Sequence, residues 1–219
     1  MPNKRLVIFA EGEGDAQALP ILLQKMLTHQ FQDEWYEWVF VDPDVFRIKG
    51  VDNLGSKTAE KFVRWTQVAQ SRGQFGGLLV VLDADSTRST CLLDDVRTLV
   101  NFLQSTGAGI TYPAAVVLLQ QEYEMLMLAS CSSLTDLKEG TLAPSNIETV
   151  RGCKEWLHQN LKQGYASIPR QAELTRQLSM ELLVQANVRS YKRFQHAIKE
   201  LVTAIRTSTP LLTPSIKGS

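Results

Sequence analysis

One stretch of the sequence decides the predicted fold: Gly77-Leu78-Leu79-Val80-Val81-Leu82-Asp83-Ala84-Asp85. The run up to Leu82 is apolar at every position, which is typical of a central strand in a parallel sheet with helices on both faces. Two aspartates follow the run directly. Because side chains alternate along an extended chain, Asp83 and Asp85 lie on the same side if the strand geometry continues that far.

Other segments of the first 130 residues predict strands and helices in alternation. Strands are predicted at 4–10, 38–48 (interrupted by Asp42-Pro43-Asp44), 77–82 and 114–119, and helices at 15–27, 59–71 and 92–103. Asp15 is the expected N-cap of the first helix. Four strands that alternate with helices predict an α/β fold with a central, mainly parallel four-stranded sheet flanked by helices.

The chain after residue 130 is predicted to be helical. Helical periodicity is found over 153–161, 171–184 and 187–205, and the final residues, with Pro210 and Pro214, show no such pattern. We therefore expect an α/β domain at 1–130, a C-terminal helical extension at 131–207 and a flexible tail at 208–219.

Composition predicts a globular, cytoplasmic protein. Of the 219 residues, 44% are hydrophobic and 21% are charged, values close to those of folded domains. Cys91, Cys131 and Cys153 lack the spacing of a zinc site or a disulfide framework, and no apolar run reaches the roughly 20 residues of a membrane span. Residues 1–150 hold 12 Lys and Arg against 19 Asp and Glu, whereas 151–219 hold 11 against 4. This asymmetry favours a polyanion or a partner of complementary charge, although a solvated helical face has the same composition.

Carboxylates follow three of the predicted strands. Ligands of open α/β sheets bind outside the carboxyl ends of the strands, where the sequence places Glu11, the Asp83 and Asp85 pair, and the Glu122 and Glu124 pair. Hard oxygen ligands suit Mg²⁺ or Mn²⁺. The alternative is ordinary turn and capping chemistry, which uses the same residue types.

The order of these motifs resembles the Toprim domain. Toprim proteins have Glu-Gly after the first strand and Asp-x-Asp after the third, and here Glu11-Gly12 and Asp83-Ala84-Asp85 stand in those places. More narrowly, the chain is similar to a bacterial Toprim-like family of unknown function, which has an ALPILL-like first helix, an E-x-E segment like Glu122-Tyr123-Glu124, and a late helix like Ser190–Phe194. The resemblance covers residues 4–130 and, more loosely, the helices to about residue 205.

The resemblance implies a nuclease related to the overcoming-lysogenisation-defect type. It assigns catalysis to Glu11, Asp83 and Asp85. The same three residues, together with Asp15 and Glu124, are expected to bind Mg²⁺ or Mn²⁺. Glu13 is the alternative to Asp15. Two metals would then serve phosphodiester hydrolysis. The setting implied is bacterial phage or mobile-element defence.

A nucleic-acid substrate, with DNA expected rather than RNA, requires basic surface beside the carboxylates. The candidates are Lys49, Lys57, Arg88, Arg189, Lys192 and Arg193. Tyr191 and Phe194, interleaved with the last three, could stack on bases but are expected to pack in the core.

Other interpretations of the sequence remain open. Asp83-Ala84-Asp85-Ser86-Thr87 also fits the DxDxT motif of haloacid-dehalogenase phosphatases, but that motif normally follows the first strand. A receiver domain is disfavoured for the same reason. A non-autonomous Toprim subunit of an ABC-type ATPase complex, inert alone, is the main alternative; the chain has no Walker A motif of its own. A degenerate Toprim scaffold and a homo-oligomer are further possibilities.

Overall fold

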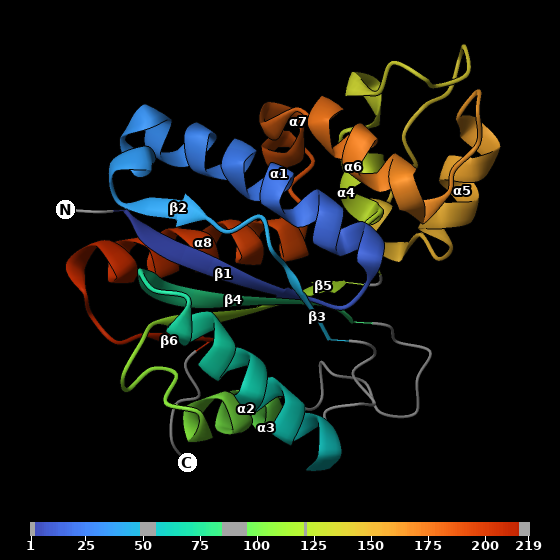
Figure 1. Ribbon diagram of the computed structural model, residues 1–219. Helices are drawn as coiled ribbons and strands as arrows, with labels where there is room; N and C mark the ends of the chain where they lie inside the picture. Colours follow the sequence, from blue (N-terminus) through green and yellow to red (C-terminus); the bar gives the residue numbers. More distant parts are fainter. Residues whose placement is uncertain (1–2, 49–55, 85–95, 121, 215–219) are drawn as a thin grey trace.

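The computed structural model of the chain describes residues 3–48, 56–84, 96–120 and 122–214. Its centre is a six-stranded sheet, in which every strand pair that the structure describes is parallel (Figure 1). The strands are β1 (Lys4–Ala10), β2 (Val39–Val41), β3 (Phe46–Arg47), β4 (Phe75–Ala84), β5 (Ala114–Gln120) and β6 (Leu212–Thr213). Their order is β2-β1-β4-β5-β6, and β3 also pairs with β1. The α/β class is confirmed.

The predicted number of four strands is wrong. The segment predicted at 38–48 forms two separate strands, β2 and β3, which both pair with β1 because Asp42-Pro43-Asp44 interrupts the extended chain between them. A sixth strand, β6, lies within the predicted tail and pairs with the start of β5 through Ala114 and Leu212. Short strands of this kind carry too few residues for an alternation pattern to be visible.

Helices cover both faces of the sheet. On one face lie α1 (Glu13–Phe31) and α8 (Arg189–Thr207), and on the other lie α2 (Ser56–Ser71) and α3 (Val96–Ser105) (Figure 1). The alternation along β1 explains this layering: Leu6 and Ile8 belong to the core with α1 and α8, whereas Val7 and Phe9 belong to the core with α2 and α3. Both faces are apolar, as expected for a parallel sheet.

The helical region after β5 packs against α1 near the carboxyl ends of the strands. It comprises α4 (Met125–Ala129), α5 (Cys153–Asn160), α6 (Ser167–Gln177) and α7 (Met180–Gln185), with short 3-10 turns at Cys131–Ser133 and Ile147–Thr149. A further 3-10 turn at Gln32–Glu37 follows α1. The single helix predicted at 171–184 is two helices, because Ser179 caps a new start by accepting a hydrogen bond from the Leu182 amide at 3.2 Å.

Residues on both sides of position 130 share one core. The larger cluster joins Leu22 of α1 and Leu79 of β4 to Leu174 of α6 and Leu201 of α8. The division of the chain into a domain and an extension stays a prediction, but the helical region buries its apolar face against the same sheet and first helix. Among the described residues, none of the helices combines the length and the apolar character needed to cross a bilayer.

Candidate functional site

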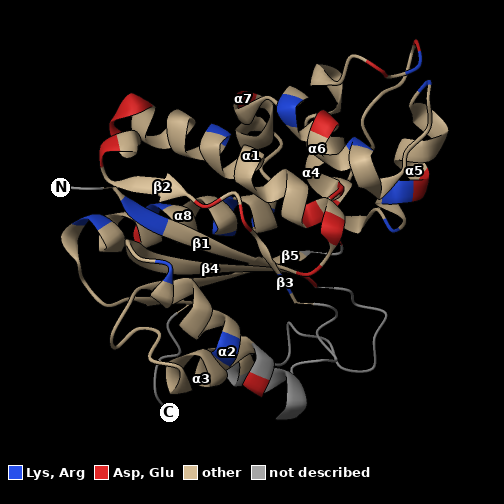
Figure 2. Ribbon diagram, viewed as in Figure 1, with Lys and Arg blue, Asp and Glu red and all other residues tan. Residues whose placement is uncertain are grey.

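Strand register brings the predicted carboxylates to one edge of the sheet. Val81 of β4 lies opposite Ala10, the last residue of β1, and Asp83 lies opposite Leu119 of β5. Glu11 therefore follows β1 close to the end of β4, where Asp83 precedes the last strand residue, Ala84. In Figure 2, red ribbon collects where β1 ends and α1 begins. The parallel topology is the reason that residues distant in sequence meet here.

Asp83 lies at the centre of this group. Burial raises its pKa well above the ordinary value of 3.8, and the neighbouring carboxylates of Asp15, Glu124 and Glu11 raise it further. Lys154 acts in the opposite direction. Three carboxylates that raise the pKa of Asp83 must lie near it, because the interaction between charges falls with distance. Four of the five predicted metal ligands thus converge; the fifth, Asp85, lies outside the described residues.

Asp15 is held by two hydrogen bonds at the start of α1. It is the third residue of the helix, and Gly12 takes the N-cap position that the sequence assigned to Asp15. Its Oδ2 accepts from the Gly12 amide at 3.0 Å, and its Oδ1 accepts from Nε2 of Gln171 on α6 at 2.6 Å. Gln171 is buried. Gly14 makes this contact possible, because a Cβ there would overlap the Gln171 side chain.

Glu124 is held from the helical region. Its side chain is 1% exposed, and its Oε1 accepts a hydrogen bond from the Tyr165 hydroxyl at 2.7 Å. Burial raises the pKa of Glu124, while Lys154 and the Tyr165 hydrogen bond lower it without cancelling the effect of burial. The carboxylate is therefore fixed in position by partners that lie at least 30 residues further along the chain.

Lys154 brings a positive charge into the carboxylate group. Its Nζ lies 3.5 Å from Glu122 Oε1 and 3.8 Å from Glu124 Oε2. Burial lowers the pKa of Lys154, but Glu124, Glu122 and Asp83 together raise it above the ordinary value. The other oxygen of Glu122, Oε2, is buried and has no hydrogen-bond partner within the described part of the chain.

Sequence reasoning missed Lys154, Tyr165 and Gln171. Tyr165 and Gln171 have no local signal, since their importance comes from contacts across the fold. Lys154 has a weak one: it lies in the first turn of α5, where the helix dipole disfavours a positive charge. Such a placement indicates that other negative charges compensate for the dipole.

The chemistry of this site suits a metal ion, but the described side chains are not arranged to hold one. Clustered carboxylate oxygens and a buried, unpartnered Glu122 oxygen are donors of the type that Mg²⁺ and Mn²⁺ prefer. However, no three His, Cys, Asp or Glu side chains in the described ranges form a group that could hold a metal ion. Asp85, the second half of the Asp-x-Asp motif, lies outside those ranges.

The alternative acid, Glu13, points elsewhere. Its Oε2 pairs with Arg47 Nη1 at 2.8 Å, and Glu13 is not among the groups that shift the pKa of Asp83. Along a helix, residues two apart lie on opposite faces. Asp15 is therefore the acid of the first turn that joins Asp83.

The predicted nucleic-acid-binding residues fall into two sets. Lys49 and Arg88 lie outside the described residues, as does the side chain of Lys57 on α2. Arg189, Lys192 and Arg193 lie on the first two turns of α8. No contact of these three side chains with the carboxylates is described.

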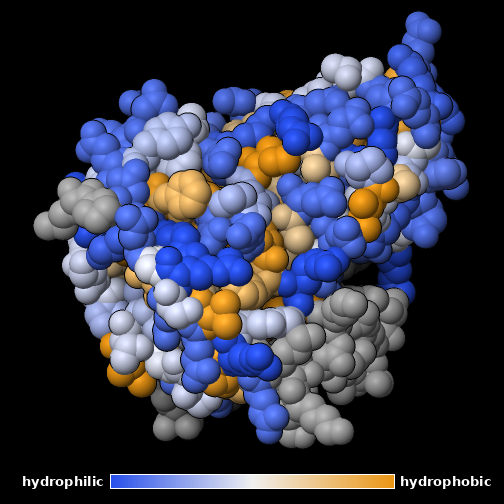
Figure 3. All heavy atoms as spheres, viewed as in Figure 1, coloured by the Kyte–Doolittle hydropathy of each residue, from blue (hydrophilic) through white to orange (hydrophobic). Residues whose placement is uncertain are grey.

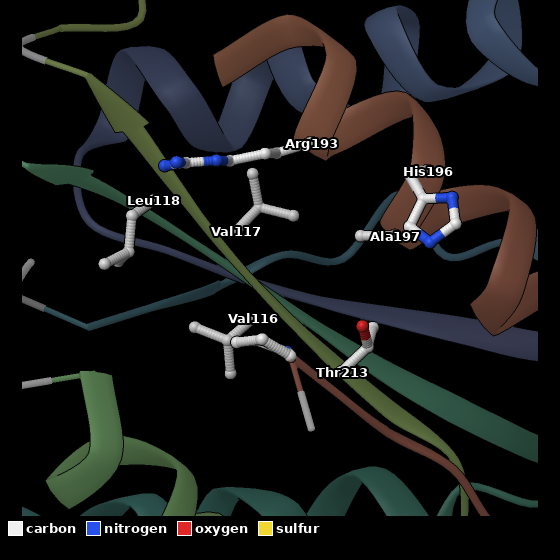
Figure 4. Close-up of a pocket in the computed structure, with 8 residues that line it drawn as sticks. Val116, Val117, Leu118, Arg193, His196, Ala197 and Thr213 are labelled. Atoms are coloured by element: carbon white, nitrogen blue, oxygen red, sulfur yellow. The ribbon is translucent and has the colours of Figure 1, made fainter. Parts of the chain in front are cut away.

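Arg193 lines a different cavity. This cavity of about 320 Å³ lies beside β5, where Arg193, His196 and Ala197 of α8 lie near Val117 (Figure 4). Tyr191 and Phe194 are buried in the core, which excludes them as base-stacking platforms.

Comparisons of the chain with protein-family models, with curated proteins and with solved structures found no match. The Toprim resemblance consequently rests on the motifs in the sequence. The geometry and charge of the carboxylate group are the basis for assigning a function.

Proposed function

We propose that the chain is a Mg²⁺- or Mn²⁺-dependent phosphodiesterase that cleaves nucleic acid, built on a Toprim-like fold. The observation that carries the proposal is the meeting of Glu11, Asp15, Asp83 and Glu124 at the carboxyl edge of a parallel sheet. Mutually repelling carboxylates are costly to a fold, and they are typical of sites where a cation offsets the repulsion.

The residues proposed to hold the metal are those four together with Asp85, although the four described ones do not form a ligand group by themselves in this structure. A bound divalent cation would polarise the phosphodiester and stabilise the negative charge that develops on its oxygens. The order of Glu11-Gly12 and Asp83-Ala84-Asp85 along the strands supports this assignment, since it is the order of the Toprim motifs.

The other residues of the site hold its charged groups in place. The Gly12 amide and Gln171 together fix both oxygens of Asp15, and Tyr165 fixes Glu124. Preorganised groups need no rearrangement when charge develops during a reaction. Lys154 supplies a positive charge beside Glu122 and Glu124, where it can bind a phosphate oxygen of the substrate.

Calorimetric titration with Mg²⁺ and Mn²⁺, followed by cleavage assays on single- and double-stranded DNA and RNA in the same buffers, tests the proposal. We expect wild-type protein to bind metal and to cleave. Glu11→Gln and Asp83→Asn should lower cleavage by at least about 10³-fold with the fold intact by circular dichroism, because each removes a charged oxygen ligand. Glu34→Gln, a change at an exposed acid in the 3-10 turn after α1, is the matched control and should cleave normally.

Two other outcomes separate the alternatives. Metal binding without cleavage of any substrate would favour a subunit that acts only beside a partner ATPase. An absence of metal binding would overturn the proposal and leave the carboxylates as structural charges. The role in bacterial defence stays a prediction from the resemblance.

A further inference from the structure

A cavity of about 340 Å³ lies beside β3, the short strand that pairs with the end of β1. It is formed by the start of α1, the connection from β2 to β3, and the end of α2; its charged lining residues are Glu13, Asp44, Arg47 and Arg72, and we call it the Arg47 groove. In Figure 3, hydrophilic residues border apolar ones on the part of the surface where β3 and the start of α1 lie.

Arg47 connects the groove with the end of β1. It is the last residue of β3 and lies opposite Ala10 of β1, the residue before Glu11. Its guanidinium pairs with Glu13 at 2.8 Å, but the two side chains are 45% and 50% exposed. Ion pairs this exposed contribute little free energy, so either partner can exchange for a stronger ligand.

Arg72 lies further along the same groove, just after α2. Its guanidinium lies over the ring of Phe46 at 5.2 Å and is 3.3 Å from Asp44 Oδ2. Phe46 is itself packed against Phe9 of the core, with ring centroids 4.9 Å apart. The aromatic contact therefore holds the guanidinium in place, while the exposed ion pair to Asp44 leaves it open to other anions.

We propose that the Arg47 groove binds the phosphodiester backbone of the nucleic-acid strand that enters the carboxylate site. This inference rests on the proposed function. A cluster of carboxylates repels a polyanion, so a substrate strand needs cationic contacts next to the cluster. Arginine suits this role because its planar fork forms paired hydrogen bonds with phosphate oxygens. Two such forks face one cavity, and one of them adjoins β1, which ends at Ala10, the residue before Glu11.

The two carboxylates of the groove give the proposal a second consequence. Glu13 competes with phosphate for Arg47, so removing its charge should strengthen binding of a nucleic acid. If the ion pair is purely structural, Arg47→Gln and Glu13→Gln should have similar small effects on stability, and neither should alter the binding of nucleic acid.

The test is fluorescence anisotropy with short labelled single-stranded and duplex DNA, measured in EDTA so that no metal-dependent cleavage occurs. We expect Arg47→Gln and Arg72→Gln each to weaken binding about tenfold, the loss expected for one hydrogen bond to a charged group. For each phosphate that a variant no longer neutralises, the dependence of log Kd on log salt concentration should become shallower by about 0.7 for single-stranded DNA and about 0.9 for duplex DNA. Glu13→Gln should tighten binding, and Arg176→Gln, an exposed arginine on α6, should leave it unchanged.

The outcomes separate this inference from the proposed function. Unchanged DNA affinity and salt dependence in both arginine variants would overturn the groove, even if the wild-type protein cleaves DNA with Mg²⁺. The groove would also be overturned if the wild-type protein failed to bind DNA at low salt. The same holds if the protein bound inorganic phosphate but not DNA. Arginine-dependent binding without cleavage when metal is added would support the groove and reject the nuclease.

Discussion

The strand side and the helix side of the carboxylate group differ in how their charges are held. On the strand side, Asp83 is surrounded mainly by groups that repel its charge, and burial adds to the cost of ionising it. On the helix side, Asp15 and Glu124 accept hydrogen bonds from Gln171 and Tyr165, both of which come from the helical region. The repulsion arises where the strands end, and the groups that offset it come from the chain after β5.

This difference explains why the helical region is packed so closely on α1. Gln171 can reach Asp15 only because Gly14 leaves room for α6 at the first turn of α1. A site made of strand ends alone would hold the same negative charges with fewer partners to orient them. The helical region thus serves as the support of the site, which its sequence does not reveal.

Among the changes that test this difference between the two sides, loss of Lys154 should have the largest effect, and it should act on the cleavage rate. Lys154→Met removes the positive charge that lies between Glu122 and Glu124, and we expect metal-dependent cleavage to fall by about 10²–10³-fold, as for loss of a preorganised charged donor. Single-turnover cleavage of labelled DNA measures this. Lys162→Met, at an exposed lysine after α5, is the matched control. Equal rates in the two variants would show that Lys154 has only a structural role.

A smaller effect is expected from closing the space between α1 and α6. Gly14→Ala places a Cβ against the Gln171 side chain and 3.0 Å from the Ser167 carbonyl oxygen, which should lower the free energy of unfolding by about 1–3 kcal/mol. Urea denaturation measures the change. Adding Gln171→Ala should recover part of the loss, because it removes one of the two obstacles. If Gly14→Ala unfolds like wild type, the close approach of the helices is wrong.

The smallest effect concerns the strand side and depends on pH. The pKa of Asp83 is raised in the folded protein but takes its ordinary value in the unfolded chain, so the folded state binds the proton more tightly. The stability that this proton gives is complete below the ordinary pKa and is lost as the pH rises through the folded value. With metal chelated, Asp83→Asn should therefore be more stable than wild type at about pH 8, by about 1 kcal/mol or roughly 2–4 °C in Tm.

Thermal unfolding as a function of pH checks this sign. The advantage of Asp83→Asn should shrink as the pH falls and vanish below about pH 3, where the wild-type carboxyl is protonated in both states. Asp33→Asn, at an exposed aspartate after α1, should show no such pH dependence. A variant that is less stable than wild type at about pH 8 would show that Asp83 is not the repelled member of the group.

The strand side of the site could be predicted because its information is local. An apolar run that ends in Asp83 indicates a buried strand and a carboxylate at its end, and parallel pairing then gathers such ends at one edge. Glu11 and Glu124 follow from the same reasoning. The approximate bounds of most long helices were predictable for a similar reason, since apolar residues at helical spacing mark a buried face.

Asp15 and Glu124 were predicted as well, but the hydrogen bonds that hold them on the helix side were not, because these depend on contacts between distant segments. Nothing near Tyr165 or Gln171 in the sequence indicates that their polar atoms meet Glu124 and Asp15. The short strand β6 was not predicted for a related reason. Its two residues pair with β5, but a two-residue segment is too short to show a periodic pattern. The break between α6 and α7 is set by Ser179, a residue that is also common within loops.

The hydrogen bond between Asp15 and Gln171 also sets the order in which the molecule can be completed during synthesis. These residues are 156 positions apart, which a ribosome covers in roughly 8–30 s at about 5–20 residues per second. Late in that time the nascent chain already has Glu11, Asp83 and Glu124 but still lacks α6. The site in which Gln171 holds Asp15 is therefore complete only after most of the chain has been made.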